Sequence, residues 1–119
     1  MDEERALKIV QKDGLELENL PDHFKKNKEI VLEAVKQHGV ALHYADNSLK
    51  KDRKIVLEAV KQHGIALRFA DNSFGEDKKI VLEALKQDDR ALEYADNSLE
   101  NDPDILAIVN KKKKSIRIG

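Results

Sequence analysis

The hydrophobic and polar positions of this chain follow a pattern that returns every 25 residues. The stretch IVLEAVKQHG occupies residues 30–39 and recurs unchanged at 55–64, and a variant, IVLEALKQDD, occupies 80–89. In each copy the apolar residues fall on one face of a helix, and the Glu, Lys and Gln residues fall outside it. The pattern therefore predicts an amphipathic helix in each copy.

The period divides the chain into repeat units followed by a shorter segment. The units span 2–26, 27–51, 52–76 and 77–101, and the segment spans 102–119. Within a unit the first helix is followed by a second amphipathic stretch, such as ALHYA, and by the turn-forming sequence DNS. Each first helix from the second unit onward is preceded by a residue whose side-chain oxygen can cap it: Asn27, Asp52, Asp77 and Asp102.

A single unit cannot bury both faces of its own apolar stripe, so neighbouring units are expected to stack. We therefore predict an all-α protein, an α-α repeat solenoid of 25-residue two-helix units that forms one domain over residues 1–119. The apolar residues Ile105, Leu106, Ile108 and Val109 predict a C-terminal capping helix in 102–119.

The residue after the first helix distinguishes the fourth unit. Gly39 and Gly64 occupy this position, where a left-handed glycine would close a Schellman turn. The fourth unit has Asp89 there, followed by Arg90 where the other units have an apolar residue. We expect this unit to be the weakest, or alternatively to keep Asp88, Asp89 and Arg90 as a polar surface for a partner.

The recurring sequence resembles a known family of short helical repeats, catalogued as domain of unknown function 4116. The residues that carry the resemblance are NKEIVLEAVKQHGVALHYADNSL at 27–49 and its copy DRKIVLEAVKQHGIALRFADNSF at 52–74. The resemblance covers 27–101 closely, 2–26 loosely, and 102–119 as half a unit. It implies a helical repeat fold and brings no assigned catalytic residues or cofactors.

Composition and charge exclude several classes of function. The net charge is −1, so no global field attracts nucleic acid or an anionic membrane. The chain has no cysteine, which excludes disulfides and thiolate metal sites. The start MDEERALKIV lacks the basic residues and apolar run of a signal peptide, and no stretch has the length and apolarity of a membrane span, so we expect a cytoplasmic protein.

Candidate chemistry is sparse. His38 and His63 occupy one position in successive units, but no carboxylate or Cys spacing completes a metal site. The run Asp71–Ser73 lacks the oxygen spacing of a calcium loop, because Phe74 interrupts it. No nucleophile–base pair or phosphate-binding loop is visible, so we predict no metal, no cofactor and no enzymatic activity.

Positions that vary while the repeat stays constant mark a candidate binding surface. Glu18, His43, Arg68 and Glu93 share one position in the second helix. Such rows run along the face that helical repeat proteins commonly use for binding. We therefore predict a non-catalytic helical repeat module that binds a protein or peptide.

Two alternatives remain open at this point. The basic tail formed by Lys111, Lys112, Lys113 and Lys114 could bind nucleic acid, although the overall charge disfavours it. The unit 77–101 has 4 basic and 7 acidic residues, giving −3, and the segment 102–119 has 5 basic and 2 acidic residues, giving +3. This contrast could instead support a weak end-to-end association between copies of an otherwise monomeric protein.

Overall fold

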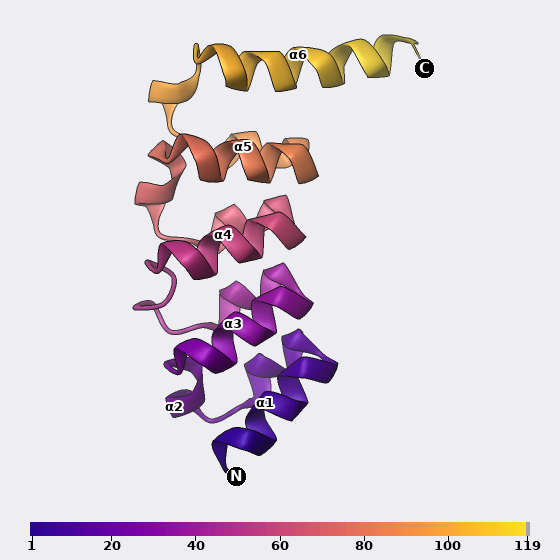
Figure 1. The fold of residues 1–119 in the computed structure, drawn as a ribbon. Coiled ribbons are helices and arrows are strands. Elements are labelled where there is room, and N and C mark those ends of the chain that lie inside the picture. Colours follow the sequence, from indigo (N-terminus) through magenta and orange to yellow (C-terminus); the bar gives the residue numbers. More distant parts are fainter. Residues whose placement is uncertain (119) are drawn as a thin grey trace.

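A computed structural model describes the backbone of residues 1–118 and the side chains of residues 1–111. The protein is all-α, and residues 1–118 contain no strand. The α-helices are α1 (Glu3–Lys12), α2 (Asp22–Lys25), α3 (Lys28–Gln37), α4 (Arg53–Gln62), α5 (Lys78–Gln87) and α6 (Pro103–Ile118). The long helices α1, α3, α4, α5 and α6 lie in successive layers along the molecule, in chain order (Figure 1).

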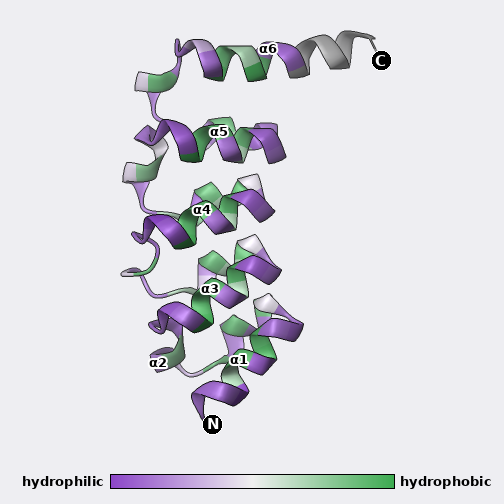
Figure 2. Ribbon diagram, viewed as in Figure 1, coloured by the Kyte–Doolittle hydropathy of each residue, from purple (hydrophilic) through white to green (hydrophobic). Residues whose placement is uncertain are grey.

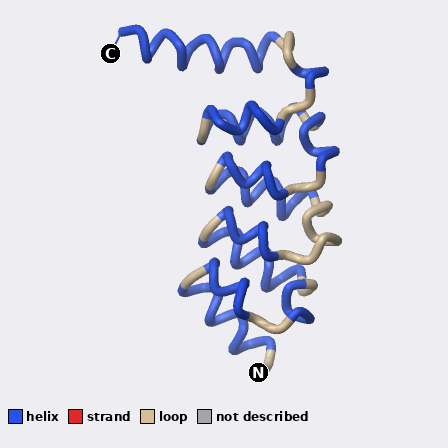
Figure 3. Tube along the Cα trace, turned by 180° about the vertical axis from the view of Figure 1, so that it is seen from behind, coloured by secondary structure: helices blue, strands red, loops and turns tan. Residues whose placement is uncertain are grey.

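The second helix of each unit is a 3₁₀ helix, where the expected α-α repeat has an α-helix. These segments are η1 (Gly14–Asn19), η2 (Gly39–Tyr44), η3 (Gly64–Phe69) and η5 (Asp89–Tyr94), and they lie beside the long helices of the same layers (Figure 3). A 3₁₀ helix has about 3 residues per turn, so it places Ala41 and Tyr44 on the same side of η2. The apolar spacing of ALHYA fits this geometry. Two further 3₁₀ segments, η4 (Asn72–Glu76) and η6 (Asn97–Leu99), form turns between units.

The layers share one continuous core, which supports the expectation that neighbouring units bury each other's apolar faces. Ile30, Val31, Ala34 and Val35 on α3 are fully buried, as are their counterparts on α4. Apolar residues recur along each of the stacked helices, with hydrophilic residues between them (Figure 2). The stack measures 51 × 30 × 16 Å, an elongated shape that follows from adding layers in one direction.

The predicted helix caps are confirmed. Asn27, Asp52 and Asp77 accept hydrogen bonds from the backbone N–H groups three residues later, at 3.1, 3.2 and 3.2 Å. Asp102 accepts from the N–H groups of Asp104 and Ile105 at 2.9 and 3.3 Å. Each cap satisfies a backbone donor that the first turn of a helix leaves without an intrahelical partner.

The prediction of a left-handed glycine is wrong. None of the glycines in the described chain has a positive φ. Gly39 is the first residue of η2, and α3 ends because His38 before it is extended, with φ −153° and ψ 108°. A Cβ on Gly39 would overlap the carbonyl oxygen of Ala59 in the next unit and lie 3.1 Å from the backbone nitrogen of His63. Glycine is therefore required because two layers touch at this position.

A backbone hydrogen bond also joins successive units at the turns. The N–H groups of Asp46, Asp71 and Asp96 donate to the carbonyl oxygens of Lys25, Lys50 and Gly75, at 3.0, 3.0 and 2.8 Å. The layers are therefore held at both edges, by the turn on one side and by the glycine contact on the other.

Within the part of the chain that the structure describes, no helix combines the length and apolarity needed to cross a bilayer.

Candidate binding surface

The structure brings the predicted row of variable residues together on one side of the stack. Glu18, His43, Arg68 and Glu93 are exposed and come from η1, η2, η3 and η5, one in each layer. Aromatic side chains pack along this row. The ring of His43 lies 4.5 Å from the ring of Phe69 in the next unit, and the Arg68 guanidinium lies 5.6 Å from the same ring.

The first two layers show the same arrangement. Tyr44 neighbours Glu18 of the preceding unit, and the pKa of its phenol is raised above the usual 10.0, first by desolvation and then by the Glu18 carboxylate. An exposed polar residue of one layer thus meets an aromatic residue of the next. The row is therefore a continuous surface in which polar and aromatic groups alternate.

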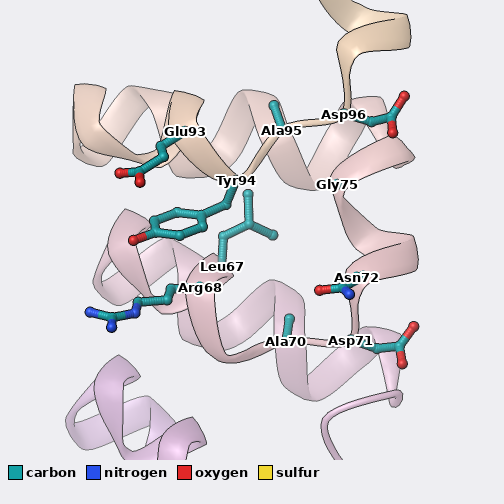
Figure 4. Close-up of a pocket in the computed structure, with 10 residues that line it drawn as sticks. All are labelled: Leu67, Arg68, Ala70, Asp71, Asn72, Gly75, Glu93, Tyr94, Ala95 and Asp96. Atoms are coloured by element: carbon teal, nitrogen blue, oxygen red, sulfur yellow. The ribbon is translucent and has the colours of Figure 1, made fainter.

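A surface cavity of about 290 Å³ opens between η3 and η5. It is lined by Leu67, Arg68, Ala70, Asp71, Asn72, Gly75, Glu93, Tyr94, Ala95 and Asp96. Figure 4 shows Arg68 and Glu93 projecting toward the same side from the two 3₁₀ helices, with the ring of Tyr94 beside them. The cavity therefore combines two opposite charges, an aromatic ring and the apolar side chains of Leu67, Ala70 and Ala95.

Gly75 shapes this cavity at the turn. Its carbonyl oxygen accepts the N–H of Asp96 at 2.8 Å, and an added Cβ would lie 2.7 Å from the carbonyl oxygen of Tyr94. Lys50 and Glu100 occupy the same position in the units on either side. The same turn bond forms at Lys50, so the bond itself does not need glycine; at Gly75 a side chain would instead press against the backbone of Tyr94 in the fourth unit.

The predicted polar break lies at the end of α5. Asp88 is partly buried and accepts the backbone N–H of Arg90 at 2.9 Å, and its carboxylate pairs with the Arg90 guanidinium at 2.6 Å. Asp89 and Arg90 are exposed, and Arg90 precedes Glu93 by one 3₁₀ turn, so both belong to the same side of η5. Asp89 does not have the strained conformation expected from the sequence. Asp88 is therefore the N-cap of η5, and the exposed Arg90 adds one more charged residue to the row.

His38 and His63 stack on each other, a contact that the sequence does not predict. Their ring centroids lie 4.4 Å apart at an angle of 22°, and His63 Nδ1 accepts the backbone N–H of Gly39 at 3.0 Å. Burial, and then the neighbouring His38, lower the pKa of His63 below its usual 6.5. Among the described residues, no cluster of three or more His, Cys, Asp or Glu side chains could hold a metal ion.

A ladder of ion pairs between units was also missed. The pairs are Lys28–Asp52 at 2.9 Å, Arg53–Asp77 at 2.9 Å and Lys78–Asp102 at 3.1 Å. A signal existed in the sequence, because a basic residue follows Asn27, Asp52 and Asp77, and another cap comes 24 positions after each of these basic residues. Each acidic partner therefore caps its own helix and binds the preceding layer.

The basic tail is only partly visible. Lys111 lies on α6 and is exposed, whereas the side chains of Lys112, Lys113 and Lys114 lie outside the described residues. Lys111, the one tail residue with a described side chain, lies on α6 and not on η1, η2, η3 or η5.

Comparison with known proteins gives one result. The family described as domain of unknown function (DUF4116) matches residues 2–47, 27–75 and 77–116. Neither the search of curated proteins nor that of solved structures gave a match. The first two matched segments overlap, the third follows them directly, and together they cover well over half of the chain, so the protein belongs to the DUF4116 family.

Proposed function

We propose that this protein is a non-catalytic helical repeat module that binds a segment of another protein through the surface row and the cavity between η3 and η5. The observation that supports this best is the cavity itself, where Arg68, Glu93 and Tyr94 surround a partly apolar hollow. Its volume of about 290 Å³ is at the lower end of pockets for small ligands and suits one peptide side chain.

The charges suggest how a peptide would be oriented. Arg68 offers a planar set of donors to a carboxylate, and Glu93 offers acceptors to a basic side chain. The preceding layer continues the row with His43, and Arg90 continues it within η5 itself. A peptide that presents an apolar residue flanked by opposite charges fits this surface.

Selection of binding peptides from a random library would test the proposal. The paired reversal Arg68→Glu with Glu93→Arg keeps the net charge and should reverse the charge preference on the two sides of the apolar residue. The matched control is Glu29→Lys with Lys36→Glu, two exposed positions on α3 away from the cavity. Failure to select any peptide, or equal selection by the reversed protein and its parent, would contradict the proposal.

We also propose a cytoplasmic location, because a chain without cysteine suits a reducing compartment. Fractionation of cells that produce the protein at its natural level tests this, and recovery in a secreted fraction would contradict it.

A further inference from the structure

Arg68 and Glu93 place opposite charges one layer apart on the same side of the stack. They occupy the same position in successive units, and both side chains are exposed. Both line the cavity between η3 and η5 and project toward the same side (Figure 4). A peptide that pairs with both residues must therefore present its own two charges at a spacing equal to one layer.

The distance between layers distinguishes the conformations that such a peptide can have. η3 and η5 pack directly against each other, and packed helices lie about 8–10 Å apart. In polyproline II, one turn of three residues rises about 9.3 Å and returns to the same face of the peptide. In a β-strand the residues that share a face lie about 6.7 Å or about 13 Å apart, and an α-helix needs seven residues to rise about 10.5 Å. Polyproline II therefore matches the layer spacing with the shortest segment.

The cavity also suits the residue that favours this conformation. Leu67, Ala70 and Ala95 supply apolar surface, and the ring of Tyr94 lies beside the two charged side chains (Figure 4). Proline is pre-set for polyproline II, and proline-rich segments dock on aromatic surfaces in this conformation. A proline held between the two charges of the peptide would lie against this part of the cavity.

Asn72 offers a donor to the backbone of the peptide. A polyproline II chain makes no internal hydrogen bonds, so its carbonyl oxygens are free to accept from a neighbouring protein. The side chain of Asn72 comes from η4, lines the cavity and is exposed (Figure 4). Its amide nitrogen can donate to a peptide carbonyl oxygen while the charged side chains hold the two ends.

The other two carboxylates of the cavity are bound by their own turns. Asp71 and Asp96 accept the backbone N–H groups two residues later, at 3.1 and 2.8 Å. Figure 4 shows both carboxylates projecting away from the ring of Tyr94. The charges that a peptide beside this ring meets are therefore Arg68 and Glu93.

We propose that the ligand of this cavity is a proline-containing polyproline II segment of another protein, with one acidic and one basic residue three positions apart. This inference rests on the proposed function and adds the conformation of the ligand and the spacing of its charges. The acidic residue pairs with Arg68, the basic residue pairs with Glu93, and a proline between them packs beside Tyr94. The order of the two charges sets the direction in which the segment runs.

Binding of short labelled peptides, followed by fluorescence anisotropy, tests the proposal. The probes carry one acidic and one basic residue, in either order, separated by two, three or four positions, with proline or alanine between them. In one of the two orders, the three-position peptide with proline should bind about tenfold tighter or more than the two-position and four-position peptides. The others can form only one of the two charge-assisted hydrogen bonds at a time. Alanine in place of proline should weaken binding, because the free peptide is then less pre-organised.

Two variants of the protein place the peptide on the cavity. Asn72→Ala should lower the affinity by about threefold or more, since it removes the donor to the peptide backbone. Its matched control is Asn47→Ala, at the same position in the preceding unit and outside the cavity, which should bind like the parent. Arg68→Glu with Glu93→Arg should prefer the opposite order of charges, still three positions apart. Circular dichroism checks that each variant keeps its fold.

Several results would overturn this inference. They are a preference for two or four positions, equal binding at all separations, tighter binding with alanine than with proline, or unchanged affinity in Asn72→Ala. Absence of binding by every probe would overturn it as well. If library selection still yields peptides that depend on Arg68 and Glu93, the proposed function stands and only the conformation is wrong; if it yields none, both proposals fail.

Discussion

Replacement of Gly39 by alanine tests how closely the layers approach each other. The φ of Gly39 is not positive, so its backbone accepts alanine, and reduced freedom of the unfolded chain would by itself stabilise the protein by about 0.4–1 kcal/mol. The new Cβ, however, would overlap the carbonyl oxygen of Ala59. The carbonyl oxygen of Ala59 belongs to the backbone of α4 and cannot rotate away as a side chain could. The two layers must therefore move apart to make room for the new Cβ.

The expected size of the effect follows from two losses. Overpacking of a well-packed interior costs about 1–3 kcal/mol. Separation of the layers also weakens the hydrogen bond from Gly39 N–H to His63 Nδ1, now 3.0 Å long, and a bond of this kind contributes about 0.5–1.5 kcal/mol. After subtraction of the gain in the unfolded state, we expect Gly39→Ala to lower the free energy of unfolding by about 1–3 kcal/mol.

Urea unfolding followed by circular dichroism gives this quantity. The matched control is Asp89→Ala, the same position in the fourth unit, which is exposed. We expect the control to change the free energy of unfolding by no more than about 0.5 kcal/mol. If Gly39→Ala is as stable as the parent or more so, the layers do not touch there. If Asp89→Ala costs as much as Gly39→Ala, the effect belongs to the position and not to the contact.

Three further predictions follow from the contacts between layers. The pKa of His63 is lowered by burial and then by His38, so the unfolded chain takes up a proton at this residue more readily than the folded protein. The contribution of His63 to stability should therefore be full above about pH 6.5 and fall as the pH drops toward the folded pKa. Urea titrations at about pH 7.5 and pH 5 should show this loss of unfolding free energy, and His63→Gln should remove it. Arg53→Ala should cost no more than about 1 kcal/mol, since its pair with Asp77 is partly exposed, and the cost should shrink at high salt in thermal melts; a cost that salt does not change would refute the ion-pair explanation. Asp89→Gly with Arg90→Val should not raise the melting temperature, because Asp89 is unstrained and Arg90 is paired with Asp88; a clear rise would restore the left-handed explanation.

The sequence predicted those features of the fold that depend on neighbouring residues. The period placed a helix in the copy that begins at Ile30, and the structure has α3 over Lys28–Gln37, with Asn27 as its cap. Helical spacing and capping are local, so they are visible in one copy of the repeat. The tighter 3₁₀ form of η2 was not visible, because short apolar spacings fit both kinds of helix.

Features that depend on the distance between layers could not be predicted in this way. Gly39 was assigned to a turn because glycine serves there in many helices, whereas its actual constraint comes from Ala59, in another layer. The stacking of His38 on His63 and the exposure of Leu92 likewise depend on what the adjacent layer holds.

One part of the candidate surface could be predicted from the sequence, and another part could not. The row from Glu18 to Glu93 followed from the period, since equal positions in stacked units must line up. The cavity beside it did not, because its lining combines residues 67–75 of one unit with residues 93–96 of the next. Gly75, which stands where the neighbouring units have Lys50 and Glu100, was the hint of this cavity in the sequence.

The bonds at the two edges of each layer have a consequence for folding. Asp71 bonds to Lys50, Gly39 to His63 and Arg53 to Asp77, so these contacts join residues separated by 21, 24 and 24 positions. The entropy lost in closing a loop depends on its length, and these loops are all about as long as one unit. Such a fold has a low contact order, which favours rapid folding. An added unit would lengthen the protein without lengthening any loop, so the entropic penalty of each contact would stay the same in a longer stack.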